Sequence, residues 1–533
     1  MIKTYLLSML CLLPFLLTAQ DWKTYPYEPA GSKVHFPADE GRHSAEPEEW
    51  WYTTGHVTGE TTGKHYSYML TYFYHPELIF DGFRVLNISD DDAGNFIEET
   101  AAVNYSVLSG DSLNILASIW QDGTESWKNK TGGDGKAIPF EYLISAGGAP
   151  GSLDLDYVSQ KRPLILADSG FLYQGYTDYT YYYSLTGIDV TGTLTFDGIT
   201  EQVTGTAWID RQYGTINPST GNRYEWFSIQ LSNGMDLNIW NIFTSERKIP
   251  EGIKFNILAV YKDENTQYTT SLFEIERLGY AWMEDKGMCY ARKWRLTSEE
   301  DNLDLVISTL HPGYEVELPF RFYEGPTTVT GTVNGEDVTG QGFAELLHSY
   351  EHPDVELVNN IAWNPSIPLK WQLHNPDDGR PVKYSLEYST DMNEYLPLAE
   401  NLEDTFYTWI SPPLVDEQEF SLKLKAYSAD SSLYGENIQQ LSYNDPGTYN
   451  TEIYPAGPRV FPNPAGETLV VNGEGLESIR IFDLNGRLVY SSPAQNNSHR
   501  VDVSGLENGV YVLSVLTANG EYLERVVVSR EIP

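Results

Sequence analysis

No segment of this 533-residue chain repeats its apolar residues at the three- and four-residue spacing of a long amphipathic helix. Short runs of Val, Ile, Thr and aromatic residues alternate with polar residues instead, which is typical of half-buried β-strands. Pairs of turn residues that favour tight hairpins separate these runs, among them Asp81-Gly82, Asp197-Gly198, Asn233-Gly234 and Asn334-Gly335. We therefore predict an all-β protein.

The N-terminus has the pattern of a cleaved secretory signal peptide. Lys3 precedes an apolar run from Tyr5 to Leu17, and Ala19 is a small residue at the exit. This run is too short to cross a bilayer, and no later stretch is apolar for long enough. We therefore expect residues 1–19 to be a signal peptide and the mature protein to be exported without a transmembrane segment. Cys289 is then the last cysteine, which excludes a disulfide within the chain.

The net charge excludes several classes of partner. The chain holds 75 acidic and 34 basic residues, a formal net charge of −41. Such an excess repels nucleic acids and anionic membrane surfaces, so neither is an expected partner. The acidic residues are spread along the whole chain, which indicates a well-solvated surface and not a dedicated acidic patch.

Two changes in composition divide the mature sequence into a large first block, a module at 356–445 and a tail at 458–533. The second change is a linker at 446–457 that is rich in Pro, Gly, Thr and Tyr. The module shows strand alternation around Trp371 and in Phe420–Tyr427. This pattern resembles a fibronectin type III domain, which implies a small β-sandwich that acts as a spacer or in adhesion.

The tail contains three motifs in a recognisable order, Val460–Ala465, Ile479–Val489 and Leu506–Leu513. Together they resemble the C-terminal sorting domain of type IX secretion cargo. The resemblance implies a small β-sandwich with a hairpin turn at Asp483-Leu484-Asn485-Gly486. It also implies a source among the Bacteroidetes, the type IX secretion machinery as a partner, and a protein that is secreted or attached to the outer surface.

The large block begins with a strand signature that is dense in aromatic residues, Glu48-Glu49-Trp50-Trp51-Tyr52. Strand alternation puts Glu49 and Trp51 on one face and Tyr52 on the other. The next strand carries a ladder of tyrosines that includes Tyr72. Such a ladder suits the wall of a ligand cavity or an ordinary half-buried strand, and from the ladder alone we favour the ordinary strand.

A second cluster places a carboxyl group beside an indole. Trp208 and Asp210 share one face of a strand, and Trp226 lies in the next strand along the chain. Burial beside the indole would raise the pKa of Asp210 and keep it protonated, as a general acid for an apolar substrate requires. An ion pair with Arg211 or another cation would do the opposite, and the chemistry alone weighs the two interpretations evenly.

These motifs, in this order, resemble the AttH-like, carotenoid-hydratase-like family. The resemblance rests on the Glu-Trp-Trp-Tyr segment, Tyr181-Tyr182-Tyr183-Ser184, the run from Ala207 to Gly214 and Gly342-Phe343-Ala344-Glu345-Leu346. It implies two lipocalin-like (calycin) antiparallel barrels in tandem, closed or nearly closed, which we place at 25–190 and 191–350. Some members of this family hydrate an isolated alkene, fungal relatives steer cyclisations, and many are described only as secreted hydrolases.

Carried over to this sequence, the resemblance makes Asp210 the candidate catalytic acid. In the carotenoid hydratases a tyrosine stands two residues before the acid, and a histidine and a tryptophan come from the preceding strand. Trp208, Tyr181 and Tyr183 take these places here, which departs from the carotenoid-hydratase pattern. We expect the ligand-binding residues to be Glu49, Trp51, Tyr52, Tyr72, Tyr181, Tyr183, Trp208, Tyr213 and Trp226.

The sequence indicates neither a cofactor nor a metal. The histidines lack metal-ligand spacing, Asp90-Asp91-Asp92 is more typical of an acidic turn than of a calcium loop, and a Gly-x-Ser-x-Gly elbow in a strand-to-helix setting is missing. Two functions stay open: an enzyme that protonates an apolar substrate through Asp210, and a protein that carries a lipid-like or polyene ligand. A cavity-facing Asp210 without a cation would favour the enzyme, and a buried ion pair with Arg211 or Arg223 would favour the carrier.

Overall fold

The computed structural model describes the chain in two compact units, one up to Asn444 and one from Asp445 onward. The expected signal peptide (1–19) and linker (446–457) lie outside the described residues. Within those residues no helix is long and apolar enough to span a bilayer. The described residues are 21–75, 79–120, 123–216, 218–283, 287–318, 320–358, 366–375, 378–410, 418–443, 458–473, 475–483, 487–494, 497–518 and 520–530.

Strands are the main secondary structure of the described chain, which confirms the predicted all-β class. Its helices are single turns of 3-10 type: η1 (Asp21–Lys23), η2 (Ala38–Glu40), η3 (Pro218–Thr220) and η4 (Glu300–Asn302).

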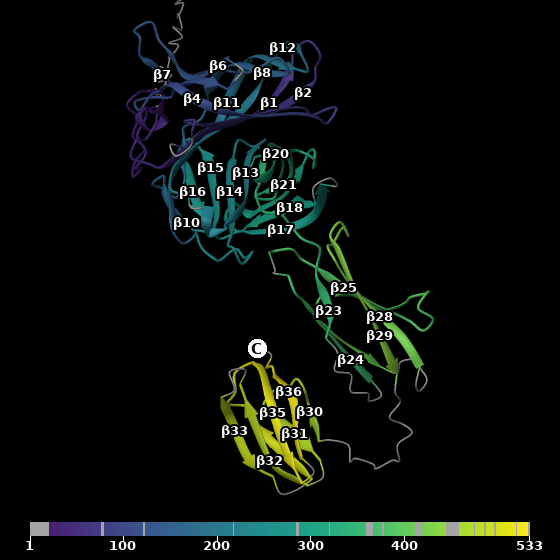
Figure 1. Ribbon diagram of the computed structural model, residues 1–533. Helices are drawn as coiled ribbons and strands as arrows, with labels where there is room; N and C mark the ends of the chain where they lie inside the picture. Colours follow the sequence, from purple (N-terminus) through teal and green to yellow (C-terminus); the bar gives the residue numbers. More distant parts are fainter. Residues whose placement is uncertain are drawn as a thin grey trace, which may run out of the picture. The chain divides into compact units, whose positions relative to one another are not determined.

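The first sheet closes into a ten-stranded antiparallel barrel, drawn in purple and blue in Figure 1. Its strands follow chain order around the barrel, and closure comes from the pairing of β8 with β11. They are β1 (Glu48–Gly59), β2 (His65–Tyr74), β3 (Gly82–Asp90), β4 (Asn95–Leu108), β5 (Asn114–Ile119), β6 (Gly123–Thr131), β7 (Ala137–Gly147), β8 (Gly151–Ser159), β11 (Asp178–Phe196) and β12 (Ile199–Gly214).

The long strand β11 divides between two neighbours. Its C-terminal half pairs with β8, whereas its N-terminal half pairs with the short strands β9 (Leu164–Ile165) and β10 (Phe171–Gln174). The pairing with β12 runs along both halves and is interrupted by an irregularity between Leu185 and Ile188. β11 and β12 therefore form one hairpin of the first sheet, and the chain enters the second sheet only after Gly214. This lies later than the boundary that we placed at residue 190.

The second sheet is an open, curved antiparallel sheet, drawn in teal to green in Figure 1. Its order ends at β16 on one side and β17 on the other, so the second of the expected barrels is half open. Its strands are β13 (Arg223–Leu231), β14 (Asp236–Phe243), β15 (Asn256–Asp263), β16 (Thr266–Thr270), β17 (Glu274–Met283), β18 (Met288–Ser298), β19 (Leu303–Thr309), β20 (Glu315–Glu317), β21 (Arg321–Val333) and β22 (Glu336–Leu346).

Side-chain alternation explains how the two sheets fit together. In β1, Trp51 points into the first barrel and joins its core, whereas Tyr52 points outward and joins an apolar cluster with Trp226 and Phe343 of the second sheet. Both residues are buried. Since successive side chains of a strand point to opposite faces, strands that are buried on both faces serve two cores at once.

Two small β-sandwiches follow, as predicted. The first has sheets β23-β24-β27 and β26-β25-β28-β29, with β23 (Val355–Leu357), β24 (Ser366–Leu373), β25 (Lys383–Ser389), β26 (Leu396–Leu402), β27 (Phe406–Ile410), β28 (Gln418–Tyr427) and β29 (Tyr434–Tyr443). Its likeness to a fibronectin type III domain stays a prediction.

The second sandwich belongs to the second unit and has sheets β30-β31-β34 and β33-β32-β35-β36. Its strands are β30 (Arg459–Phe461), β31 (Thr468–Asn472), β32 (Leu476–Phe482), β33 (Leu488–Pro493), β34 (Ser498–Asp502), β35 (Gly509–Thr517) and β36 (Gly520–Val528). The expected hairpin turn at 483–486 lies mostly outside the described residues, but Asp483 accepts a hydrogen bond from the backbone N–H of Arg487 at 2.9 Å.

A buried ion pair crosses the interior of the first barrel. Arg84 Nη2 lies 2.8 Å from Glu125 Oε1, and both side chains are almost fully buried. The hydroxyl of Tyr72 and the backbone N–H of Gly147 also donate to this carboxylate, at 2.6 and 2.8 Å. Tyr72, which we expected to bind a ligand, is therefore bound to Glu125 inside the barrel.

Replacing Glu125 by Gln should lower the free energy of unfolding by about 3–5 kcal/mol, because it leaves the buried Arg84 guanidinium without its counter-charge. Urea unfolding followed by fluorescence measures the change. Glu99→Gln is the matched control, since Glu99 contacts the same arginine at 3.4 Å from a partly exposed position and should cost about 1 kcal/mol or less. Equal effects of the two substitutions would contradict the role of Glu125 as the buried counter-charge of Arg84.

Candidate active site between the two large sheets

Asp210 lies on β12 where this strand is covered by the second sheet. Its neighbours across the strands are Tyr52 on β1 and Ser184 on β11. Alternation turns its side chain, like that of Trp208, away from the barrel interior and toward the second sheet. Only 3% of Asp210 is exposed. The predicted proximity of Asp210 and Trp208 is therefore present in the structure.

Three neutral groups donate hydrogen bonds to the Asp210 carboxyl. Ser184 Oγ and Trp208 Nε1 each lie 2.6 Å from Oδ1, and the Tyr182 hydroxyl donates to Oδ2. Trp208 and Ser184 thus use both lone pairs of Oδ1, while Oδ2 accepts from Tyr182 alone. One lone pair of Oδ2 is left for a proton.

A second layer of donors fixes the direction of these hydrogen bonds. Trp226 Nε1 donates to the Tyr182 hydroxyl at 2.9 Å. Asn238 Nδ2 donates to the same hydroxyl at 2.8 Å and to Ser184 Oγ at 3.2 Å. Because both hydroxyls accept from these groups, their own protons are directed at Asp210. The network therefore spans β11, β12, β13 and β14.

Burial raises the pKa of Asp210 from 3.8 to about 7. Desolvation is the largest cause, and the nearby carboxyl of Glu345 raises the pKa further, while the hydrogen bonds from Ser184, Tyr182 and Trp208 lower it. At neutral pH the protonated and ionised forms are thus both populated. A group in this range can give up a proton and regain it.

The alternative ion pair with Arg211 or Arg223 is not formed. Arg211 points to the opposite face of β12, where Nη2 lies 2.5 Å from Glu49 Oε2. Arg223 Nη1 donates to the backbone carbonyl of Asn222. No ion pair within the described part of the chain includes Asp210.

Two further carboxyl groups face each other close to Asp210. Glu324 on β21 and Glu345 on β22 are direct cross-strand partners. The Tyr52 hydroxyl donates to Glu324 Oε1 at 2.9 Å, and the Tyr224 hydroxyl donates to Glu345 Oε1. Burial raises the pKa of both carboxyls, and the proximity of Glu345 raises that of Glu324 further.

The structure brings together four of the ten residues that the sequence indicated, namely Asp210, Trp208, Tyr52 and Trp226. The other six lie on the barrel side of the first sheet or at its rim. Glu49 is bound to Arg211, Trp51 donates to the Glu40 carbonyl, Tyr72 to Glu125 and Tyr183 to the Asp39 carbonyl, and Tyr181 stacks on Tyr213.

The residues of β11 that contact Asp210 are not the ones that the sequence indicated. The sequence indicated Tyr181 and Tyr183, whereas Tyr182 and Ser184 contact Asp210. Ser184 pairs with Asp210, and this register determines that Tyr182 and Ser184 lie on the same face of the sheet as Asp210. The register of β11 against β12 is therefore the signal that would have identified these two residues. Asn238, Glu324 and Glu345 were also missed, because they come from strands of the second sheet whose positions the sequence did not fix.

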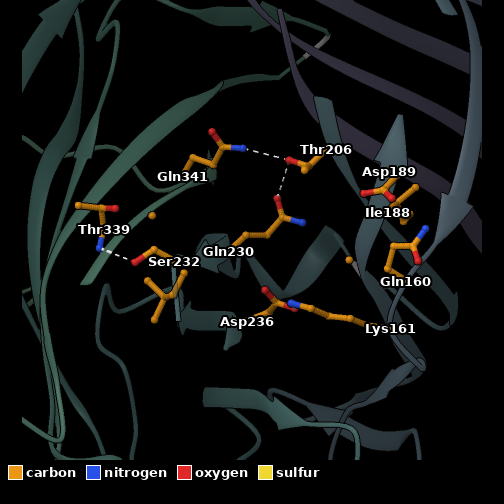
Figure 2. A pocket seen from close by; sticks show the side chains of 13 residues that line it. Gln160, Lys161, Ile188, Asp189, Thr206, Gln230, Ser232, Asp236, Thr339 and Gln341 are labelled. Atoms are coloured by element: carbon orange, nitrogen blue, oxygen red, sulfur yellow. Dashed lines mark hydrogen bonds and ion pairs between the residues drawn. The ribbon is translucent and has the colours of Figure 1, made fainter. Parts of the chain in front are cut away.

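Asp210 does not line either of two hollows on the surface of the described chain. One, of about 480 Å³, is an open polar groove between the two sheets, where Figure 2 shows Lys161 reaching Asp236 and a chain of hydrogen bonds from Gln341 through Thr206 to Gln230. The other, of about 580 Å³, lies beside Arg277 and Arg380.

Near Asp210, a group of partly buried apolar side chains, here called the apolar rim, borders the contact between the two large sheets. Trp50, Phe73, Phe83, Tyr224, Trp240, Leu318 and Leu347 are partly buried and surround the buried cluster that contains Tyr52, Trp226 and Phe343. An apolar ligand that reaches Asp210 from this side has to displace some of these side chains. Among the described residues, groups of three potential metal-binding side chains are not found.

The raised pKa of Asp210 gives its stability effect a definite pH dependence. A carboxyl with a higher pKa in the folded than in the unfolded state stabilises the folded protein. This contribution is complete at a pH below the pKa of the unfolded state, and it is lost as the pH rises through the pKa of the folded state. Between about pH 4 and 7, the free energy of unfolding of the wild type should fall relative to Asp210→Asn by up to about 1.4 kcal/mol per pH unit. Urea unfolding of both proteins across this range measures the difference, and a constant difference would contradict the shift.

Comparison with known proteins identifies relatives of more than half of this chain. Kievitone hydratase of Fusarium solani subsp. phaseoli is 21% identical over 376 residues, which cover 66% of this chain and 98% of the relative. A crystal structure assigned to AttH from Nitrosomonas europaea matches with a TM-score of 0.50 and 20% identity, over 61% of this chain and 99% of that one. The crystal structure of kievitone hydratase from Nectria haematococca matches with a TM-score of 0.48 and 16% identity, over 61% of this chain and 98% of that one.

Two family models match the sequence. Residues 459–529 match the secretion system C-terminal sorting domain, which directs the protein through type IX secretion to the medium or the outer surface. Residues 27–350 match the AttH-like model, and this match covers both large sheets and the network around Asp210. Because it spans more than half of the sequence, the chain belongs to the AttH-like family.

Proposed function

We propose that this exported protein is a cofactor-free hydratase that adds water to a carbon–carbon double bond of an apolar substrate, with Asp210 as the proton donor. The observation that carries the proposal is the environment of Asp210: a buried carboxyl held by three neutral donors and by no cation of the described chain. An ionised aspartate paired with arginine could not protonate a weakly basic alkene.

The groups around Asp210 suit the charges that such a reaction creates. Proton transfer to one alkene carbon leaves a carboxylate, which Tyr182, Ser184 and Trp208 are already oriented to stabilise. The other carbon becomes positively charged. The rings of Trp226 and Tyr52, 5.3 Å apart and edge to face, offer π-faces for this cation.

The apolar rim supports an apolar substrate. Its aromatic and aliphatic side chains lie in one cluster with Tyr52 and Trp226. Water is excluded from the buried part of this cluster, which strengthens the electrostatic effects at Asp210. The name of the kievitone hydratase relative, whose sequence matches over 98% of its length, supports hydration over the other reactions of an acid.

A carrier without chemistry is the second candidate. The same partly buried aromatic rim would hold a lipid-like or polyene ligand, and the closely surrounded Asp210 would then be a structural hydrogen-bond acceptor. The two candidates differ in whether a bound alkene is converted.

Asp210→Asn separates them. With kievitone and the acyclic polyene lycopene as probes, the variant should bind like the wild type but hydrate about 10²–10⁴-fold more slowly, the usual effect of losing a general acid. Mass spectrometry detects the gain of one water molecule, and fluorescence quenching measures binding. Asp197→Asn, an exposed change in the β11–β12 turn, is the control that should leave both unchanged. Binding of a probe without hydration by the wild type would establish the carrier instead.

Removing residues 459–529 tests the sorting domain independently of catalysis. Its core is formed by its own two sheets, so the rest of the chain should fold without it. We expect the shortened protein to accumulate in the periplasm, as measured by cell fractionation and immunoblotting. Normal appearance at the cell surface would contradict the sorting role.

A further inference from the structure

Hydration of an alkene releases a proton as well as consuming one. When water attacks the cation, its oxygen carries an extra proton that has to leave before the product is neutral. In the proposed reaction Asp210 has just given its proton to the alkene, and its Oδ1 already accepts two hydrogen bonds. A second acceptor beside the same space would remove this proton on the side from which water arrives.

We propose that the carboxyl pair Glu324–Glu345 is the general base of this reaction and takes the proton released by the adding water molecule. This inference rests on the proposed hydratase function. The two residues belong to β21 and β22 and are absent from the candidate site that the sequence indicated.

The position of the pair relative to Asp210 suits this role. Tyr52 lies directly opposite Asp210 in the β1–β12 pairing, and its hydroxyl reaches Glu324 at 2.9 Å. Trp226 lies directly opposite Glu345 in the β13–β22 pairing, and its indole N–H reaches Tyr182, which donates to Asp210. The rings of Tyr52 and Trp226 thus lie between the acid on one side and the carboxyl pair on the other.

The environment of the pair keeps it ready to accept a proton. Glu324 is 1% exposed, and within the described residues neither glutamate forms an ion pair with a lysine or arginine. Repulsion disfavours the ionisation of two adjacent carboxyls at once, and for the proposed reaction we take the pair to hold one shared proton and one negative charge. Glu324 Oε2 has no hydrogen-bond partner among the described residues, which leaves it open to a proton or a water molecule.

Access of water differs between the two residues. Glu345 is partly exposed, and Tyr224, which donates to it, belongs to the apolar rim. In the proposed reaction, water therefore comes to the pair from the side of Tyr224 and Glu345, whereas the substrate takes its proton from Asp210.

The proposed steps balance in atoms and charge. The O–H bond of Asp210 breaks and a C–H bond forms, which leaves a carboxylate and a carbocation. The oxygen of water forms the C–O bond, one of its O–H bonds breaks, and the proton passes to the pair, which becomes fully protonated. Return of one proton from the pair to Asp210, through exchange with solvent, restores the starting state.

Glu324→Gln and Glu345→Gln test the inference, because glutamine keeps the shape of the side chain and can still bond to its neighbour. With kievitone and lycopene in D₂O, each variant should hydrate about 10²–10⁴-fold more slowly than the wild type. Deuterium incorporation into the recovered alkene, which needs only reversible protonation by Asp210, should continue. Asp210→Asn should lose both hydration and deuterium incorporation.

Glu201→Gln is the matched control. Glu201 is also a largely buried carboxyl that accepts from a tyrosine, Tyr66 at 2.9 Å, but it lies nine positions from Asp210 along β12. The Glu201→Gln substitution should leave both hydration and deuterium incorporation unchanged. Wild-type hydration by either pair variant, or loss of deuterium incorporation together with hydration, would overturn the role of the pair while leaving Asp210 as the acid. Unchanged hydration by Asp210→Asn would overturn the proposed function itself.

Discussion

The burial of β12 on both faces is the constraint from which the site follows. One face of this strand lines the first barrel and the other faces the second sheet. The side chains of neighbouring residues therefore lie in two different buried environments. Asp210 and Arg211 are adjacent in sequence, yet the arginine neutralises Glu49 on the barrel side and leaves the aspartate among neutral donors. Alternation places the two adjacent side chains on opposite faces of the strand, and burial of both faces keeps each of them away from solvent.

The all-β class and the proximity of Asp210 to Trp208 could be predicted from the sequence, because alternation within a strand is a local property. Tyr52 and Trp226, which lie in the same region of the structure, were indicated by the resemblance to the AttH-like family. The sequence could not reveal which residues of β11 face Asp210. That choice depends on register, and a slip of one residue exchanges Tyr182 for Tyr181 or Tyr183. Glu324 and Glu345 depend on how the second sheet lies against the first, a long-range property that no local pattern carries.

The buried carboxyls lower stability, and this cost itself points to function. Charges that are buried are usually paired, as at Arg84 and Glu125. Asp210, Glu324 and Glu345 contact hydroxyl, indole and carboxyl groups instead. Natural proteins break such rules mainly at sites that act on a ligand. The cost is met by the large apolar cores on either side of the contact between the two large sheets, which hold the two sheets together around the polar centre.

The hairpin of β11 and β12 also determines how this protein can be divided. A fragment that ended near residue 190 would contain β1 to β8 and most of β11 but lack β12, so its barrel would open along β1 and expose two long strand edges. Such edges recruit other chains. A fragment that ended after Gly214 would keep the barrel closed while separating Asp210 from Trp226 and Asn238. The acid and its supporting donors would then be shared between two complementary fragments, and the complete network would exist only in their non-covalent complex.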